Sequence, residues 1–392
     1  MLHPPFQLPR GAVLPDFGNG GIFGLARDIN GWLRHAAPPP HASGLQLEGG
    51  GPVILMVIDG LGDAFLQRHG QGSTILRYRQ RRLTSVFPST TASAVTTLLT
   101  GLSPARHGLT GWFMHDRRFG GVIAPLPLYR RGAGALQSLA LTPRLFPYDG
   151  MFQYSKVAAT MISPQDIAWS PFSCRHGRGA ELRGYAYPDA FVPAIVEAAL
   201  QPGSARRFIH AYYPRFDAVC HHYGAHSPKA ISEFARIDRY FDQLLNGLSG
   251  RGASVILTAD HGFIDAPDRR HLHLSKTPKL EAMLDSPLFG ERRVVFCRVR
   301  QGAESDFEAL ARVQLRGRAV VQPSGRLIDA GFFGPGPVNP RLAERCGTHV
   351  LLMEAGWTLT DRMPGERLHR MTGVHGGLSA DEMWVPLVHV QP

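Results

Sequence analysis

The strongest constraint on the fold of this chain is an apolar run of strand length that stops at an acidic residue. Residues 53–58 are all apolar, and Asp59 follows them directly. Residues 208–213 and 253–257 are also largely apolar, and each precedes an aspartate by a few positions. Such runs are typical of parallel strands that are buried on both faces. The three aspartates would then emerge at the carboxyl edge of one sheet.

A helix is predicted between the second and third of these strands. Ser227 supplies its N-cap and Pro228 its first helical position. Apolar residues follow at helical spacing, namely Ile231, Phe234, Ile237, Phe241, Leu244 and Leu248. Strands that alternate with helices predict an α/β fold, with a doubly wound, mostly parallel sheet and helices on both faces. Ligands of such sheets bind beyond the carboxyl ends of the strands, where the three aspartates fall.

The 392 residues divide into three parts by composition and pattern. Residues 1–50 are rich in Pro and Gly and predict an irregular N-terminal arm. Residues 51–274 and 361–392 form the predicted catalytic core, in which we expect residues 112–190 to be an excursion of loops and short helices. Residues 275–360 predict a small α/β insertion that caps the site, with strands at 293–299 and 318–322 and a helix at 304–315.

Charge and cysteine content bear on partners and location. The net charge is +11, but the cations are scattered, and a nucleic-acid partner is less favoured than a small anionic substrate. The four cysteines form no CxxC pair, so neither a disulfide framework nor a thiolate metal site is predicted. No apolar stretch approaches the roughly 18 residues of a membrane span. We expect a cytoplasmic protein with no membrane partner, and the sequence defines no oligomeric state.

Oxygen and nitrogen ligands recur where the predicted strands end. Three carboxylates and three imidazoles stand there or in a glycine-rich turn: Asp59, Asp217, His221, Asp260, His261 and His375. Such a set suits two divalent ions, with zinc favoured and manganese the alternative. A single aspartate at a strand end is more often a turn former or a helix cap. The conjunction of six such residues favours the metal site.

A hydroxyl-rich turn accompanies these ligands. Residues 86–93 read VFPSTTAS, and the run that follows opens a predicted helix. Each hydroxyl there could be a plain N-cap. The amides at a helix N-terminus also bind anionic oxygens, and a cation can turn a hydroxyl into a reactive nucleophile. The turn is therefore the candidate site of nucleophilic attack.

Five motifs in this order resemble the type I phosphodiesterases and nucleotide pyrophosphatases, a branch of the alkaline phosphatase superfamily. They read VIDG, FPSTTASAVTTLLTGLSPARHG, DAVCHHYG, TADHG and GVHGG. In that family the turn reads Pro-Ser/Thr-x-Thr, which implies that Thr91 is the catalytic nucleophile. The resemblance also implies the metal ligands: Asp59, Thr91, Asp260 and His261 around one ion, and Asp217, His221 and His375 around the other.

The resemblance implies a metal-dependent hydrolase of small phosphate esters, with phosphodiesters or nucleotide pyrophosphates as substrates and a covalent phosphothreonine intermediate. One position departs from the family, which commonly has an Asn three residues after the nucleophile as a donor to a phosphoryl oxygen. Ala94 stands here, so Ser93 or a backbone amide would have to replace that donor. A phosphomonoesterase or phosphomutase of the same superfamily, or a nucleic-acid-binding module without catalysis, are the alternatives.

Overall fold

The computed structural model of the protein describes residues 7–34, 45, 47, 50–137, 140–203, 206–366 and 370–392. Its centre is a seven-stranded sheet with the strand order β2-β19-β10-β1-β9-β7-β8. The strands are β1 (Val53–Ile58), β2 (Arg79–Thr84), β7 (Ala158–Pro164), β8 (Glu181–Tyr185), β9 (Arg207–Tyr213), β10 (Ser254–Thr258) and β19 (Trp384–Val390). Strand β19 runs antiparallel to both of its neighbours, whereas the pairs from β10 to β8 are all parallel.

The three strands expected from the sequence lie side by side at the middle of this sheet. Strand β1 pairs with β10 on one side and with β9 on the other, and Val57 faces both Thr258 and Tyr212. All residues of β1 and β10 are buried, which explains their continuous apolar runs. Because the register is level, the residues after all three strands emerge at the same edge of the sheet.

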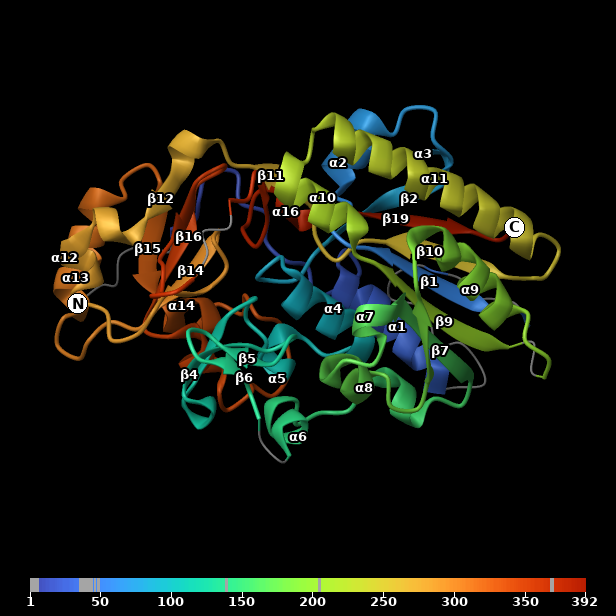
Figure 1. The fold of residues 1–392 in the computed structure, drawn as a ribbon, viewed down its shortest axis with the longest axis horizontal. Helices are drawn as coiled ribbons and strands as arrows, with labels where there is room; N and C mark the ends of the chain where they lie inside the picture. Colours follow the sequence, from blue (N-terminus) through green and yellow to red (C-terminus); the bar gives the residue numbers. More distant parts are fainter. Residues whose placement is uncertain are drawn as a thin grey trace.

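Helices cover both faces of the central sheet, as predicted. In Figure 1, α2 (Asp63–His69), α10 (Arg215–Tyr223) and α11 (Pro228–Leu248) lie on one side of the sheet, and α1 (Ile22–Arg34), α4 (Thr91–Thr100) and α8 (Pro171–His176) lie on the other. The predicted cap of α11 is confirmed, since the Ser227 side chain accepts a bond from the amide of Ala230. The apolar stripe faces the core except at Ile231, which is exposed.

The expectation of an irregular arm over residues 1–50 is wrong where α1 forms. Ile22, Leu25, Ile29 and Leu33 are fully buried, and α1 packs against α4. Their spacing is that of one helical face and predicts this helix, but the many Pro and Gly residues around it favoured an irregular segment. Residues 1–6, 35–44, 46, 48 and 49 of the arm lie outside the described residues.

Residues 112–190 also contain more regular structure than we expected. They supply β7 and the edge strand β8 of the central sheet, together with a small antiparallel sheet. Strand β8 is only partly buried and lacks an apolar run, which is why the sequence pattern does not show it. The small sheet consists of β3 (Met114–Asp116), β4 (Gly121–Ala124), β5 (Tyr129–Arg130) and β6 (Gly134–Ala135).

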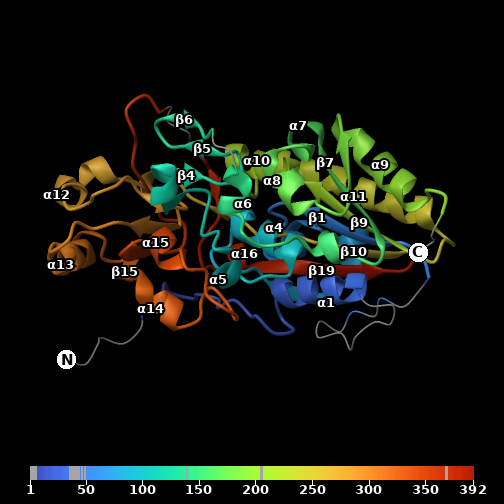
Figure 2. The ribbon, with the colours of Figure 1, turned by 90° about the horizontal axis from the view of Figure 1, so that it is seen from below.

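A second lobe lies beside the core, built largely from residues 275–360 (Figures 1 and 2). Its sheet has the order β13-β14-β16-β15 and is antiparallel throughout. The elements are β13 (Phe289–Gly290), β14 (Val294–Cys297), α13 (Glu304–Gln314), β15 (Ala319–Pro323), α14 (Ser324–Asp329), α15 (Leu342–Cys346) and β16 (His349–Met353). The two strands and the helix expected in this insertion correspond to β14, β15 and α13. We call this lobe the cap.

Short strand pairs join the cap region to the core. Strand β12 (His271–His273) pairs with β17 (Thr358–Thr360), and β11 (Ile264–Asp265) pairs with β18 (Gly373–Val374). All four cysteines are free thiols. Among the described helices, none has the length and apolar character needed to cross a membrane.

Candidate metal centre and active site

The level strand ends bring the predicted acidic ligands together. Asp59 follows β1 directly, and Asp260 lies two residues beyond β10. Asp217 lies in the first turn of α10, which begins just after β9. His375 comes from a different part of the chain, directly after β18. The pairing of β18 with β11 carries this histidine back to the strand that follows His261.

The ligand atoms of this set lie in two overlapping groups. In one group, the atoms of Asp59, Asp260 and His261 are all within 4.8 Å of one another. In the other, those of Asp217, His261 and His375 are equally close. His221 adjoins the second group, with its Nε2 3.4 Å from Asp217 Oδ1 and 3.2 Å from His375 Nε2. The structure therefore assembles all six predicted side chains in one place, whereas the neighbouring His222 is exposed.

Thr91 lies beside this cluster at the start of α4. Its Oγ1 is 3.2 Å from Nε2 of His261. Thr90 is the N-cap of the helix, and its hydroxyl donates instead to Glu291 at 2.6 Å. The hydroxyl of Thr90 is thus bonded to the cap and not to the ligand cluster. The turn presents the Thr91 hydroxyl, the one that the sequence motif indicates.

All three imidazoles are held in the same way. Nδ1 donates to a backbone carbonyl oxygen in each: from His221 to Gly373 at 2.9 Å, from His261 to Gly262 at 3.1 Å and from His375 to Ser89 at 3.2 Å. Because carbonyl oxygens only accept, each neutral ring leaves the lone pair of Nε2 facing the cluster. Such carbonyl contacts are the usual way in which metal-ligating histidines are oriented.

Two of the carboxylates, Asp59 and Asp260, each accept hydrogen bonds through only one of their two oxygens. Asp260 Oδ1 accepts from the amides of Gly60 and His261, both at 3.0 Å. Asp59 Oδ2 accepts from the hydroxyl of Tyr212. The second oxygens, Asp59 Oδ1 and Asp260 Oδ2, are buried without a hydrogen-bond partner, as is Asp217 Oδ1. Buried acceptors left unpaired in this way are costly, and a bound cation would remove that cost.

Electrostatics support the same reading. Burial and the neighbouring charges of Asp260 and Asp217 raise the pKa of Asp59 well above its ordinary value. Burial also raises the pKa of Asp217. Burial and then the nearby His261 and His221 lower the pKa of His375. Asp59 and Asp217 resist ionisation here and His375 resists protonation, and a set of carboxylate oxygens and neutral imidazoles fits divalent cations of the zinc type.

Two side chains that support the cluster were not expected from the sequence. Tyr212 orients Asp59, and its position at the end of β9 was the only signal for that role. The ring of Phe263 packs against His221, His261 and His375, with centroid distances of 5.0, 5.6 and 5.3 Å. Gly60 permits this packing, because a Cβ there would lie 2.4 Å from the Phe263 ring and its φ is +77°.

The structure also shows the contacts of two residues near the turn, Ser93 and His107. The Ser93 hydroxyl is buried and donates to the carbonyl of Leu109 at 2.8 Å, so it does not replace the family Asn at the Ala94 position. A backbone amide at the start of α4 is the remaining candidate donor. His107 accepts a bond from the amide of Leu109 and contacts Thr97, so its ring supports the turn that follows it.

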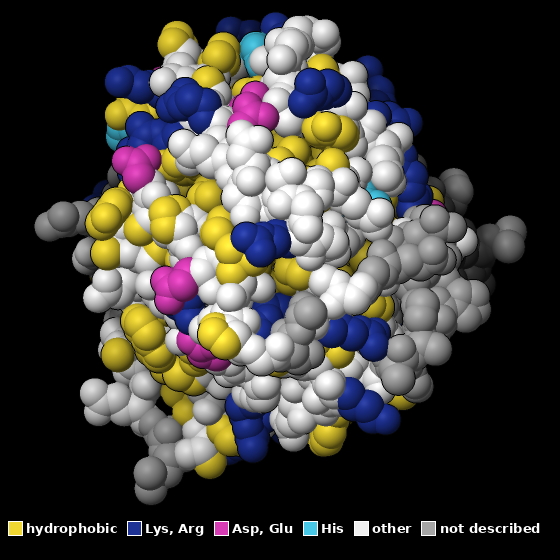
Figure 3. All heavy atoms as spheres, turned by 90° about the vertical axis from the view of Figure 1, so that its right-hand side faces the viewer, with side chains coloured by type: hydrophobic (Ala, Val, Ile, Leu, Met, Phe, Trp, Pro, Cys, Tyr) yellow, Lys and Arg dark blue, Asp and Glu magenta, His cyan; other side chains and the backbone are white. Residues whose placement is uncertain are grey.

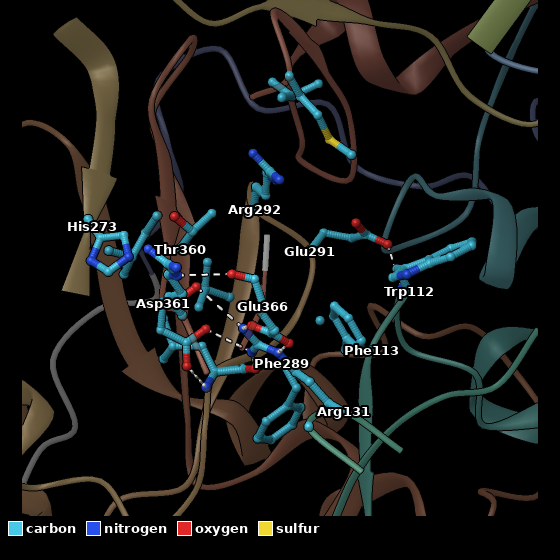
Figure 4. Close-up of a pocket in the computed structure, with 18 of the residues that line it drawn as sticks. Trp112, Phe113, Arg131, His273, Phe289, Glu291, Arg292, Thr360, Asp361 and Glu366 are labelled. Carbon is cyan, nitrogen blue, oxygen red and sulfur yellow. Dashed lines mark hydrogen bonds and ion pairs between the residues drawn. The ribbon is translucent and has the colours of Figure 1, made fainter. Parts of the chain in front are cut away.

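A cavity of about 1080 Å³ opens over Thr91 and the second ligand group. Its walls come from three separate segments: residues 112–134, residues 268–295 of the cap side, and residues 359–371 (Figure 4). Trp112, Arg131 and Glu291 line it, and the sequence analysis identified none of them. Their positions depend on how distant segments dock, which local patterns do not encode.

The comparisons with known proteins agree with this geometry. The model of the family described as type I phosphodiesterase / nucleotide pyrophosphatase matches residues 53–378. No curated protein matches the chain. Among solved structures, murine ectonucleotide pyrophosphatase / phosphodiesterase 5 is 16% identical, with a TM-score of 0.62, over 87% of this chain and 88% of that one.

A second similar structure is phosphonoacetate hydrolase from Sinorhizobium meliloti in complex with phosphonoformate. It is 18% identical, with a TM-score of 0.66, over 87% of this chain and 90% of that one. At these identities the two structures show the shared alkaline phosphatase-like fold. The family model, in contrast, spans most of the sequence. The chain therefore belongs to the type I phosphodiesterase / nucleotide pyrophosphatase family and is a phosphoric ester hydrolase.

Proposed function

We propose that this chain hydrolyses phosphodiesters or nucleotide pyrophosphates, with Thr91 as its nucleophile and two divalent cations in the site. One observation carries the proposal. Six ligand side chains turn unpaired oxygens and nitrogen lone pairs toward one space, and the Thr91 hydroxyl lies at its border.

Two sets of side chains would hold the ions. Asp59, Asp260, His261 and Thr91 suit one, and a second set is formed by Asp217, His221 and His375. Zinc is the favoured ion because half of the six acidic and imidazole ligands are histidines, and manganese is the alternative. When bound, such ions supply positive charge that favours the deprotonated hydroxyl and balances charge on the phosphoryl oxygens.

The chain's own residues account for the remaining steps. The Thr91 oxygen attacks phosphorus, the ester oxygen leaves, and a phosphothreonine forms. Water then displaces Thr91 and releases the phosphate product. Thr91 lies beside the buried His261 at the N-terminus of α4, where the helix amides would bind the anionic oxygens of the phosphate.

The cavity favours a small phosphate ester as the substrate. An inactive form of murine ectonucleotide pyrophosphatase / phosphodiesterase 5 has been solved in complex with AMP, and the Sinorhizobium meliloti enzyme in complex with phosphonoacetate. The volume of about 1080 Å³ accommodates ligands of that size here.

The test compares two chromogenic substrates at matched pH. We expect kcat/KM for bis-p-nitrophenyl phosphate to exceed that for p-nitrophenyl phosphate by about tenfold or more. An advantage of about tenfold for the monoester would overturn the diesterase proposal, while leaving the family assignment intact.

A further inference from the structure

The turn between β13 and β14 carries a carboxylate of the cap into the active site. Glu291 follows Gly290, the last residue of β13, and its side chain crosses from the cap to the core. It packs so closely over the loop after His375 that a Cβ on Gly376 would lie 2.6 Å from the Glu291 Cβ. Glu291 therefore lies between the turn that bears the nucleophile and the loop that bears a proposed metal ligand.

Two short hydrogen bonds hold this carboxylate in position. Glu291 Oε1 accepts from the Thr90 hydroxyl and from the Trp112 amide, both at 2.6 Å. Figure 4 shows the bond to Trp112 at the wall of the cavity. No described residue bonds to the second oxygen, Oε2. The carboxylate is thus oriented by the residue next to Thr91, and it lines the cavity that would receive the substrate.

The other carboxylates of the cavity wall are paired with arginines. Asp361 and Glu366 both bind Arg131, whose five N–H groups are all used by these two residues and the carbonyls of Leu288 and Asp361. Asp268 is paired with Arg370. Among the described residues, no ion pair joins Glu291 to an arginine or lysine, although the charge of the adjacent Arg292 acts on its carboxylate. Outside the proposed metal ligands, Glu291 is the carboxylate of the described cavity wall that is not paired with an arginine.

An ionised carboxylate beside the proposed nucleophile discriminates between substrates by their own charge. A monoester brings a phosphate with two negative charges, whereas the attacked phosphate of a diester or pyrophosphate carries one. In a partly desolvated site, an added like charge at short range disfavours the dianion strongly. We propose that Glu291 is a specificity-determining residue that selects substrates whose attacked phosphate carries a single negative charge. This inference rests on the proposed function and names the residue behind its substrate preference.

The substitution Glu291→Gln tests the charge with little change of shape. The amide oxygen can still accept from Thr90 and Trp112, so the packing of the turn is kept. Assays at pH 9 stay above the pKa of about 7 to which burial raises Glu291. We expect the ratio of kcat/KM for bis-p-nitrophenyl phosphate to that for p-nitrophenyl phosphate to fall by about tenfold or more. Glu291→Ala serves as a second neutral variant if the first one fails to fold.

Glu308→Gln is the matched control, since it removes the same charge from α13 of the cap, outside the cavity wall. It should leave the ratio unchanged.

Calorimetric titration with inorganic phosphate and with dimethyl phosphate gives the same comparison without turnover, and Glu291→Gln should bind phosphate about tenfold more tightly. Equal effects of Glu291→Gln on both ligands would overturn the inference and leave Glu291 a purely structural role. Failure of the wild type to cleave either ester would count against the proposed function alone, because the binding comparison still decides the role of Glu291.

Discussion

His261 is the residue on which the two ligand groups depend, because it belongs to both. Its side chain is fully buried, and its ring stacks on that of His375 at a centroid distance of 3.7 Å. Its Nε2 lies 3.2 Å from Thr91 Oγ1 and 3.3 Å from Asp59 Oδ1. The proposed nucleophile and the proposed ligand cluster are thus connected through one imidazole, which is buried on all sides.

The paired threonines of the turn give the sharpest test at this scale. Thr91→Ala should lower kcat by about a thousandfold or more, because it removes the proposed nucleophile. Metal content should be retained, since the other six ligands remain. Thr90→Ala loses the bond to Glu291 and should cost less than about tenfold. Steady-state kinetics and metal analysis of both variants check this, and the reverse order of effects would move the nucleophile to Thr90.

A buried histidine should make stability depend on pH. His210 lies in β9 between β1 and β7, and neither of its ring nitrogens has a partner among the described residues. Burial lowers its pKa from 6.5 to about 4, so the unfolded chain binds more protons than the folded one between these values. The contribution of neutral His210 is complete above pH 6.5 and is lost as the pH falls toward 4.

Comparison with His210→Leu separates the effect of His210 on stability from that of the carboxylates whose pKa values are raised, Asp59 and Asp217. As the pH falls below about 6.5, the free energy of unfolding of the wild type should decline relative to that of the variant by up to about 1.4 kcal/mol per pH unit. Above about pH 7 the two curves should run parallel. Denaturant unfolding at several pH values measures both. Curves that stay parallel down to pH 4 would contradict the assignment.

At the scale of elements, the segment between β13 and β14 joins the cap to the core. Beside Glu291 it carries Arg293, which is 1% exposed and forms a bidentate ion pair with the fully buried Glu382 at 2.8 and 2.9 Å. Glu382 in turn accepts from the amide of Gly377, two residues after His375. A charge pair therefore ties the cap sheet to the loop that carries a proposed metal ligand.

Breaking this pair should destabilise the protein strongly. Arg293→Met leaves the buried Glu382 without its partner, which typically costs about 3–5 kcal/mol. Arg312→Ala is the control, because its pair with Glu308 on the surface of α13 should contribute less than about 1 kcal/mol. Chemical denaturation of both variants measures the difference. If Arg293→Met lowers the free energy of unfolding no more than Arg312→Ala does, the ion pair between Arg293 and Glu382 does not stabilise the protein.

The elements also show what the sequence could and could not predict. Strands β1 and β10 are buried on both faces, so their apolar runs and the acidic residues after them were recognisable. Strand β8 is an edge strand with a half-exposed surface, and its pattern is indistinguishable from that of a loop. The clustering of the proposed ligand residues was predictable because each belongs to a short motif. Glu291 was not, because it meets Thr90 across 201 positions of the chain, through docking of the cap.

At the scale of the whole molecule, the excess of positive charge bears on the kind of partner. The net charge is +11. On the face shown in Figure 3, Lys and Arg side chains are interspersed with apolar and uncharged atoms. Scattered cations of this kind suit the attraction of small anions better than the tracking of a phosphate backbone. The cytoplasmic location stays a prediction, consistent with the four free cysteines.

The two lobes meet around one cavity, and the proposed activity requires the metal ligands and Thr91 to act together there. The protein would be stripped with a strong chelator and titrated with zinc while hydrolysis of bis-p-nitrophenyl phosphate is followed. Removal of the ions should abolish activity, and activity should return to a plateau at about two equivalents of metal per chain. Full activity in a metal-free sample would contradict the account.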